Sequence, residues 1–324
     1  MKILVTGGAG YIGGTVAQIL MDRGYTVVVY DNLCHARPSM VPPGATFVDG
    51  DVADSKRLGD LFRDGSFAGV MHFAALIEAG ESMRRPEIYF RNNTMATLGL
   101  LEAIMESNLR KFVFSSTAAV YGEPLHTPIT EDAALLPTNP YGESKLLVEQ
   151  MLSWMQRIHG LRYASLRYFN VAGAIPGRGE AHEPESHLIP LILDVALGRR
   201  DNIKVFGQDY PTSDGTAVRD YIHVQDLAEA HLLAFRALDE RERMIYNLGN
   251  GRGFTVREVV ESARRVTGHP IPVDELPRRP GDPAVLIAGS TKIESELGWK
   301  PKYVRLDDIM SSAWEWHQQR YRAQ

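Results

Sequence analysis

The sequence predicts an α/β fold in which a doubly wound parallel sheet is followed by a smaller C-terminal α/β lobe. Short β-branched runs alternate with amphipathic stretches along the first half of the chain, and this order is typical of a parallel sheet with helices on both faces. A glycine-rich turn follows the first run, and after about residue 170 the alternation gives way to loop-like sequence and shorter elements. We therefore expect a Rossmann domain over residues 1–169, with segments near 220–248 returning to it, and a second lobe over 170–324.

The β-branched and amphipathic runs give the expected elements in order. Strands are expected at 3–6, 26–30, 46–48, 69–73, 111–116 and 163–168, and helices near 11–22, 54–64, 87–107 and 139–158. The last of these helices has the clearest start signal. Thr138 or Asn139 can cap it, and Pro140 suits its first turn.

Composition narrows the class of protein. Of 324 residues, 44% are hydrophobic and 23% charged, as is usual for a soluble globular chain, and the net charge of -5 argues against a nucleic-acid or anionic membrane partner. Cys34 is the only cysteine, which excludes an intrachain disulfide and suits a reducing compartment. The chain reaches glycines too early for a signal peptide, and we see no apolar run of about 18 residues. We expect a cytoplasmic protein.

The stretch "GGAGYIGG" directly after the first strand predicts a dinucleotide site. Gly7, Gly10 and Gly13 give the spacing G-x-x-G-x-x-G, with the helix expected to begin near Tyr11. Glycine here permits a tight turn and lets a pyrophosphate approach the backbone, while the helix N-terminus offers free N–H groups to the phosphates.

Acidic and small residues at later strand ends indicate which dinucleotide binds. The second strand ends at Asp31, whose carboxylate can bind the adenosine ribose hydroxyls and would repel a 2′-phosphate, so NAD is expected rather than NADP. Asp51 and Val52 follow the third strand, where an adenine would lie. Ala74 and Ala75 follow the fourth, where small side chains let the backbone close over the cofactor.

Tyr141 and Lys145 stand four residues apart at the start of the helix near 139–158 and therefore share one helical face. The strand at 111–116 places Ser115, Ser116 and Thr117 at the carboxyl edge of the sheet, where such folds bind ligands. A phenol acting as a base near pH 7 needs its pKa lowered by about 3 units, or about 4 kcal/mol. A neighbouring ammonium in a buried site favours that shift, so we expect an acid–base site here.

The histidines give no comparable signal for a metal. His72, His182 and His223 lack close ligand spacing with Cys or Asp partners, and structural roles are the simpler interpretation. No metal site is expected.

Specific motifs extend over residues 1 to roughly 316. They include "VTGGAGYIG", "YDNL", "FAALIEAGES", "FSSTAAVYG", "PYGESK", "LRYFNVAGA", "FGQDYPTSDGTAVRDYIHVQDLA", "YNLGNGRGFTVREV" and "RRPGDPA". On these motifs the chain resembles the extended short-chain dehydrogenase/reductase family and, within it, the UDP-glucose (UDP-galactose) 4-epimerases. The resemblance implies a bound NAD, a UDP-sugar substrate and inversion of carbon 4 of a UDP-hexose through a 4-keto intermediate.

The resemblance also assigns roles to single residues. Tyr141 is implied as the catalytic base and acid, Lys145 as the residue that binds the nicotinamide ribose and lowers the pKa of that tyrosine, and Thr117 as the partner of the sugar's 4-hydroxyl. The implied cofactor-binding residues are Gly7, Gly10, Tyr11, Ile12, Gly13, Asp31, Asn32, Asp51, Val52, Phe73, Ala74, Ala75, Asn92, Ser115, Tyr141, Lys145 and Tyr168. The implied substrate-binding residues are Thr117, Tyr141, Asn170, His187, Leu188, Phe206, Arg219, Arg279 and Asp282.

Several alternatives follow from the same pattern. A 4,6-dehydratase needs a carboxylic acid directly after the threonine, where this chain has Ala118 and Ala119. A regulator that only senses NAD would be expected to have lost Tyr141 or Lys145, and a scaffold role explains none of these residues. A 4-epimerase of UDP-N-acetylglucosamine, a UDP-uronic acid or UDP-xylose remains the alternative. By the resemblance, Leu286 occupies the position whose side-chain size determines how much space is left beside the sugar.

The helices near 87–107 and 139–158 match those that form a homodimer in the family.

Overall fold

The chain forms two compact units in a computed structural model that describes residues 1–107, 109–279 and 282–322. The first unit combines Met1–Gly122, Ala134–Arg167 and Ala228–Tyr246. The second combines Glu123–Ala133, Tyr168–Leu227 and Asn247–Gln324. Each unit is therefore assembled from segments that are distant in the sequence.

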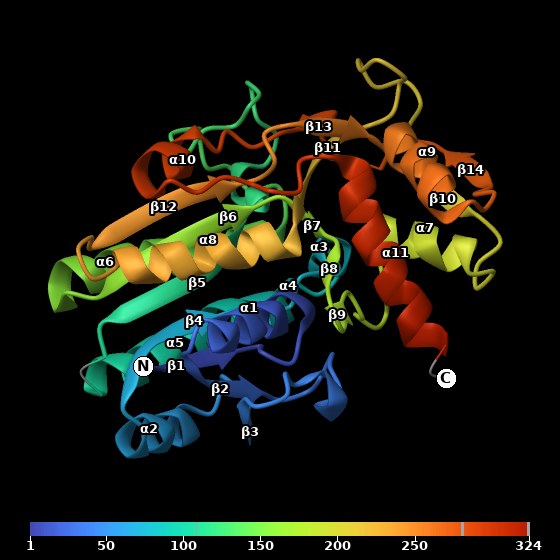
Figure 1. Cartoon of the computed structure of the whole chain (residues 1–324). Coiled ribbons are helices and arrows are strands. Elements are labelled where there is room, and N and C mark those ends of the chain that lie inside the picture. Colours follow the sequence, from blue (N-terminus) through green and yellow to red (C-terminus); the bar gives the residue numbers. More distant parts are fainter. Residues whose placement is uncertain (108, 280–281, 323–324) are drawn as a thin grey trace. The chain divides into compact units, whose positions relative to one another are not determined.

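A seven-stranded sheet in the order β12-β6-β5-β4-β1-β2-β3 forms the centre of the first unit (Figure 1). Its strands are β1 (Lys2–Thr6), β2 (Thr26–Asp31), β3 (Thr46–Asp49), β4 (Phe67–His72), β5 (Lys111–Thr117), β6 (Arg162–Tyr168) and β12 (Arg243–Leu248). β1, β2, β3, β4 and β5 pair in parallel, with Val5 of β1 between Val29 of β2 and Met71 of β4. Strands of this kind are nearly continuous in apolar residues because both faces of the sheet are covered.

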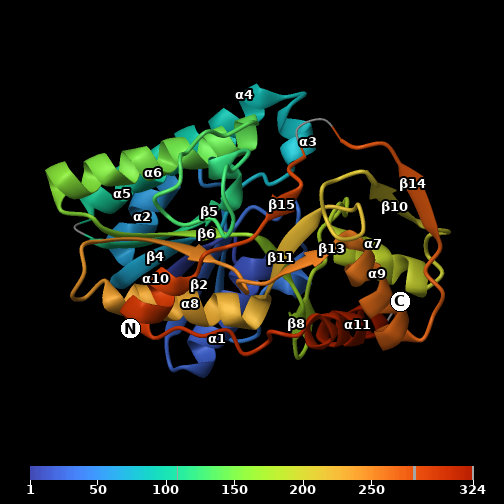
Figure 2. The same cartoon turned by 90° about the horizontal axis from the view of Figure 1, so that it is seen from above.

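Helices cover both faces of this sheet. In Figure 2, α2 (Ser55–Asp64), α5 (Ala96–Glu106) and α6 (Pro140–His159) lie on one face, and α1 (Tyr11–Asp22) and α8 (Val224–Ala237) lie on the other. The apolar side chains of α2, α5 and α6 form one core with β4 and β5, which includes Leu58, Leu101 and Phe112. The doubly wound parallel sheet predicted from the sequence is confirmed.

The expected strand and helix boundaries differ from the structure in three places that matter for the site. β4 ends at His72 and β5 continues through Thr117, so Phe73 lies in a loop and Thr117 is the last strand residue. The stretch expected as one helix near 87–107 is divided into α4 (Pro86–Tyr89), a π-helical turn η2 (Phe90–Met95) and α5. Such π turns are often found at functional sites.

The start of α6 is fixed by its cap. Asn139 is the capping residue: its Oδ1 accepts a hydrogen bond from the backbone N–H of Gly142 at 2.9 Å, and Pro140 occupies the first turn. At the other end Gly160 adopts φ +69°, a left-handed conformation that glycine allows without strain. Both ends of α6 are therefore specified locally, which sets the position of its first two turns.

Three more short elements belong to the first unit. They are η1 (Pro38–Met40), α3 (Ala79–Ser82) and the 3-10 turn η3 (Ala118–Tyr121), and α8 belongs to this unit from Ala228 onward. Among the described residues, no helix combines the length and apolar character needed to cross a membrane.

Small sheets and a helical layer make up the second unit. α7 (Leu188–Ala196), α9 (Val256–Thr267) and α11 (Leu306–Arg322) share one core that includes Ile192, Val259 and Trp314. The strands are β7 (Asn170–Ala172), β8 (Ala174–Ile175), β9 (Arg178–Gly179), β10 (Ile203–Phe206), β11 (Val218–His223), β13 (Gly253–Thr255), β14 (Val273–Leu276) and β15 (Val285–Leu286), and α10 is Thr291–Leu297. β11 pairs with β13, β15 and β7, so it is the strand on which this part of the second unit is organised.

A buried carboxylate anchors β11. Asp220 is fully buried and accepts hydrogen bonds from the backbone N–H groups of Asn250, Gly251 and Ala288 at 2.7 to 3.0 Å. Burial raises the pKa of Asp220 to about 6, although these N–H groups act in the opposite direction. The side chain therefore connects β11 to two separate loops.

We expect Asp220→Ala to lower the free energy of unfolding by several kcal/mol, because each buried donor left unpaired costs about 1–3 kcal/mol. Denaturant unfolding of the purified variant measures this loss. Asp274→Ala, at an exposed position on β14, is the matched control and should change the free energy by less than about 0.5 kcal/mol. Equal stability of the two variants would show that Asp220 is not an anchor.

Candidate active site

The glycine turn after β1 leaves no space for a side chain at Gly7 or Gly13. Gly7 has φ +69°, and a Cβ added there would lie 2.5 Å from the backbone nitrogen of Ala74. A Cβ on Gly13 would lie 2.4 Å from the carbonyl oxygen of Gly7. Gly10 caps α1 without a side-chain hydrogen bond, and the first turn of α1 has no acidic residue. Tyr11 and Ile12, both partly buried, begin that turn.

Asp31 connects this turn to the end of β2. One of its carboxylate oxygens accepts a hydrogen bond from the N–H of Ala9 at 3.0 Å, and the other accepts one from the N–H of Leu33 at 2.9 Å. Burial raises the pKa of Asp31, while these two N–H groups act to lower it. The carboxylate predicted to bind a ribose therefore also fixes the conformation of the glycine turn.

The residues expected around an adenine lie at the ends of β2 and β3. The side-chain amide of Asn32 donates to the Asp51 carboxylate at 2.8 Å, and both residues are exposed. Val52 is instead buried, with its side chain in the core beside α2 and α5. The structure therefore places the polar side chains of Asn32 and Asp51 next to each other, just after the ends of β2 and β3.

The loop after β4 passes close to the glycine turn. Phe73 donates its backbone N–H to Thr6 at 3.0 Å, and its ring centroid lies 4.9 Å from that of His231. Ala74 and Ala75 follow, both partly buried, and the backbone of Ala74 is the part that excludes a side chain at Gly7.

The Thr117 hydroxyl lies beside the Tyr141 phenol at the carboxyl end of β5, where it acts to lower the pKa of that phenol. Thr117 Oγ1 also accepts the backbone N–H of Ala119 at 3.1 Å, which orients its hydroxyl. Burial raises the pKa of Tyr141, the hydrogen bond from Thr117 lowers it, and the Glu78 carboxylate raises it, with a net increase. The ring of Tyr89 packs edge-on against that of Tyr141, with centroids 6.5 Å apart.

Lys145 lies one turn after Tyr141 on α6 and is buried. Its ammonium donates to the carbonyl oxygen of Ser115 at 3.0 Å and lies 5.0 Å from the ring centroid of Phe114. Burial lowers the pKa of Lys145 to about 7. The lysine is therefore poised between its charged and neutral forms near neutral pH.

The amide of Asn93 holds this part of α6 in place. Asn93 Nδ2 donates to Ser144 Oγ at 3.1 Å and to the carbonyl of Leu76 at 2.9 Å, while its Oδ1 accepts the N–H of Leu76. The neighbouring Asn92, which the resemblance implied as a cofactor-binding residue, is partly buried and donates to Asn93 Oδ1. Only the π turn, which the sequence does not signal, shows that Asn93 faces the helix.

These features of the first unit fit a bound dinucleotide. A turn that excludes a Cβ at Gly7 and Gly13, a helix N-terminus without a side-chain cap and a carboxylate at the end of β2 form the arrangement that binds a pyrophosphate and a ribose. Thr117, Tyr141 and Lys145 supply a hydroxyl, a phenol and an amine at the end of β5. Tyr168, which is buried at the end of β6, was also expected in this site.

In the second unit, the structure pairs four of the expected substrate-binding residues in two contacts. The Arg219 guanidinium forms an ion pair with the Asp282 carboxylate. The Arg279 guanidinium carbon lies 3.8 Å from the ring centroid of Phe206, at the end of β10. Arg219 is largely buried whereas Arg279 is exposed, so the two cations lie in different environments.

β11 pairs with two strands that carry further residues expected at the substrate site. Leu286 of β15 pairs with Arg219, and the exposed Asn170 of β7 pairs with Tyr221, two residues further along β11. Leu286 is therefore beside Arg219 in the sheet.

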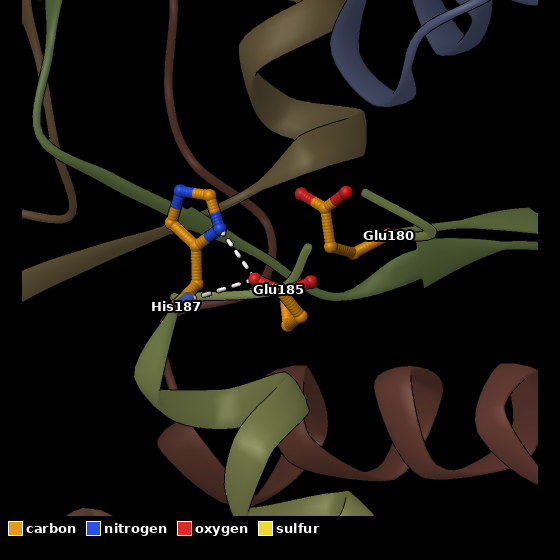
Figure 3. Close-up of side chains that lie close together, drawn as sticks. All are labelled: Glu180, Glu185 and His187. Carbon is orange, nitrogen blue, oxygen red and sulfur yellow. Dashed lines mark hydrogen bonds and ion pairs between the residues drawn. The ribbon is translucent and has the colours of Figure 1, made fainter. Parts of the chain in front are cut away.

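His187 and Leu188 lie at the start of α7, where His187 caps the helix without a side-chain cap bond. His187 Nδ1 and Glu185 Oε1 are 2.7 Å apart, and Glu185 also accepts the backbone N–H groups of Ser186 and His187 (Figure 3). Glu180 completes a group whose ligand atoms lie within 4.8 Å of one another. Within this group His187 Nδ1 thus has a carboxylate partner in Glu185.

The three histidines considered at the sequence level have identifiable contacts. His72 bonds the hydroxyls of Thr6 and Thr97 at 2.7 and 2.9 Å, and burial lowers its pKa to about 3. His223 bonds Ser312 at 3.0 Å, and the His182 ring centroid lies 6.4 Å from that of His187. The expectation that the chain holds no metal stays a prediction.

Comparison with known proteins identifies the family. The sequence profile of the NAD dependent epimerase/dehydratase family matches residues 3–249. The UDP-glucose 4-epimerase of Streptomyces lividans is 56% identical over 317 residues, which cover 98% of this chain and 96% of that protein.

Two solved structures show the same fold over the whole chain. A crystal structure of a UDP-glucose 4-epimerase superimposes with a TM-score of 0.97 at 50% identity and covers 99% of this chain and 98% of the other. The UDP-glucose 4-epimerase of Bifidobacterium longum, in complex with NAD+ and UDP, gives a TM-score of 0.94 at 39% identity, with 98% of each chain covered. The chain therefore belongs to the NAD dependent epimerase/dehydratase family, and its cofactor is NAD.

Proposed function

We propose that this protein is a UDP-glucose 4-epimerase, which inverts carbon 4 of a UDP-hexose and interconverts UDP-glucose and UDP-galactose. The observation that carries the proposal is the Thr117–Tyr141–Lys145 group at the end of β5, in a chain 56% identical to a UDP-glucose 4-epimerase. We place the enzyme in the cytoplasm, in keeping with a single cysteine and no disulfide.

NAD, when held by the glycine turn and Asp31, would supply an acceptor for the hydride of carbon 4 and a donor of hydride to the opposite face of the sugar. Tyr141 takes the proton from the 4-hydroxyl and gives it back, and the Thr117 hydroxyl stabilises the tyrosine oxygen while it is charged. Lys145, when protonated, favours the phenolate for the same electrostatic reason. Because burial lowers the pKa of Lys145 to about 7 in the protein alone, its charge depends on the groups bound beside it.

We assign the binding of the UDP portion of the substrate to residues of the second unit. Arginine's planar fork suits a diphosphate better than lysine does, which favours Arg219 and Arg279 for this role. The Phe206 ring, already stacked with Arg279, offers a flat apolar surface for the uracil. We assign Asn170, His187, Leu188 and Asp282 to the same nucleotide-binding set.

The residues after Thr117 favour epimerisation over dehydration. Elimination of water needs an acid beside the sugar, yet Ala118 and Ala119 begin the turn η3, and Ala119 contacts Thr117 through its backbone N–H. A 4-keto sugar formed here therefore has no nearby acid from this turn to expel a hydroxyl, and it is reduced again.

A homodimer is part of the proposal. Trp154 and Ile158 lie one turn apart on the outer face of α6, with 61% and 67% of their surfaces exposed, and Met95 before α5 is 66% exposed. Large apolar side chains exposed on neighbouring helices are typical of an interface. A second copy of the same helices would cover them, as in the family's four-helix arrangement.

Tyr141→Phe should lower kcat by about 10²–10⁴-fold, as expected when a general base is lost, while the variant still folds and retains NAD. Rates of UDP-galactose formation and NAD release on denaturation measure the two effects. Tyr163→Phe, which removes a buried hydroxyl at the start of β6 in the same unit, should keep its activity. Near-normal turnover of Tyr141→Phe would remove Tyr141 from the mechanism.

Leu286 should make the enzyme partly selective against an acetamido group on carbon 2. Apolar contacts discriminate by about 1–3 kcal/mol, so UDP-N-acetylhexosamines should react about 10–200-fold more slowly than UDP-glucose. Leu286→Tyr should reduce kcat/KM for the acetylated sugars selectively, and Leu286→Ser should increase it. If neither substitution changes the ratio of the two kcat/KM values, the assignment of Leu286 is wrong.

Sedimentation velocity should show a dimer, and Trp154→Glu with Ile158→Glu should shift it to monomer because two charges cannot be buried without partners. Leu125→Glu, at a 91% exposed position outside these helices, is the matched control and should stay dimeric. A monomeric wild type, or a dimer that survives both substitutions on α6, would refute this interface.

A further inference from the structure

Four polar residues of the first unit are buried behind the site and are not used by the proposed chemistry. Ser116, Tyr121, Glu149 and Arg167, which we call the buried bridge, have relative exposures of 1%, 2%, 5% and 2%. Charged side chains are almost never this buried unless they are paired. The bridge therefore needs an explanation.

Several hydrogen bonds and an ion pair connect the four residues of the buried bridge. Arg167 Nε lies 2.9 Å from Glu149 Oε1, and an Arg167 terminal nitrogen lies 2.5 Å from Glu149 Oε2, which gives a two-pronged ion pair. Ser116 Oγ donates to Glu149 Oε1 at 2.5 Å, and the second terminal nitrogen of Arg167 donates to Tyr121 Oη at 2.8 Å. Burial works against the charge of Arg167, but the bonds to Glu149 raise its pKa above the ordinary value.

The bridge connects the elements that carry the proposed catalytic residues. Glu149 lies on α6, one turn after Lys145 and two turns after Tyr141, so the three share one helical face. Ser116 directly precedes Thr117 on β5, and Tyr121 ends the turn η3 whose Ala119 bonds Thr117. Arg167 on β6 joins the carboxylate on α6 to that turn.

Stability does not explain such a group. Removing two charges from water is costly, and replacing a buried ion pair by apolar residues of similar size is often neutral or stabilising. The fork geometry of Arg167 against Glu149 instead fixes distance and direction, because both bonds are satisfied in one arrangement.

We propose that the buried bridge positions α6 against β5, so that the oxygen of Tyr141 meets Thr117 and the nitrogen of Lys145 meets Ser115. Glu149 and Arg167 are thus positioning residues for acid–base chemistry. A slide of α6 by about 1 Å would misalign both contacts, and misplacements of that size cost about 10²-fold in rate. The inference rests on the proposed function and deepens it.

The test replaces the ion pair by Glu149→Met with Arg167→Met in the full-length, NAD-loaded protein. We expect the melting temperature to be retained and the KM for UDP-glucose to change by less than about threefold, because substrate binding is not altered. We expect kcat to fall by about tenfold or more, since the reacting groups are misaligned.

A second readout reports on Tyr141 directly. Ultraviolet difference titration of each protein against its own Tyr141→Phe form gives the pKa of the Tyr141 phenol. In the double variant it should rise by at least about half a unit, because Thr117 and Lys145 stabilise the phenolate less well. An unchanged pKa together with an unchanged kcat would overturn the proposal.

Two controls separate positioning from general stability. Ile104→Ala creates a cavity in the core beside α5 and should lower the melting temperature without moving the Tyr141 pKa. If the double variant fails to fold, Tyr121→Phe is the deciding variant, because it removes one hydrogen bond to Arg167 but keeps the aromatic ring. We expect this variant to have a kcat about 3–10-fold lower than the wild type and a raised pKa of Tyr141. A Tyr121→Phe protein with the kcat of the wild type and the same pKa of Tyr141 would overturn the proposal.

Failure of the proposed function gives a different result. If the wild type does not interconvert UDP-glucose and UDP-galactose, the function is wrong, yet the Tyr141 titration still tests whether the bridge aligns the phenol.

Discussion

Burial of two titratable side chains at the end of β5 is the constraint on which the rest of the site depends. Burial raises the pKa of Tyr141 and lowers the pKa of Lys145 to about 7, so it opposes the charged form of both. The chemistry proposed here needs those charges. Thr117 on one side and the Ser115 carbonyl on the other are the groups that offset the effect, and each acts only at hydrogen-bond distance. The chemistry therefore depends on the position of α6 relative to β5.

The fold controls it with several independent contacts. Asn139 caps the start of α6, Asn93 in the π turn holds Ser144 between the two reactive residues, and Glu149 joins the next turn to Arg167. The second unit has a comparable arrangement around β11, where Asp220 bonds three backbone N–H groups and the adjacent Arg219 pairs with Asp282. In both units a buried carboxylate fixes an element that carries proposed ligand-binding residues.

Much of the first unit could be predicted because its signals are local. The glycine turn, Asp31 at a strand end and the Tyr141–Lys145 spacing are visible in short stretches, and alternating strands and helices predict a parallel sheet with helices on both faces. The contacts of Asn93 could not be predicted, since a π turn places it and not Asn92 against α6. The pairing of Glu149 with Arg167 joins residues from a helix and a strand, and no spacing rule in the sequence links them. The Arg219–Asp282 pair is equally non-local, and both residues came from the family resemblance.

The most direct test of the account follows the hydrogen of carbon 4. UDP-glucose deuterated at that carbon is incubated in ordinary water, and the UDP-galactose formed is analysed by NMR and mass spectrometry. Removal and return of the same hydrogen within a site that excludes water predicts that the deuterium is found at carbon 4 of the product. Loss of the label to solvent, or a label that stays in UDP-glucose with no UDP-galactose formed, would contradict the account.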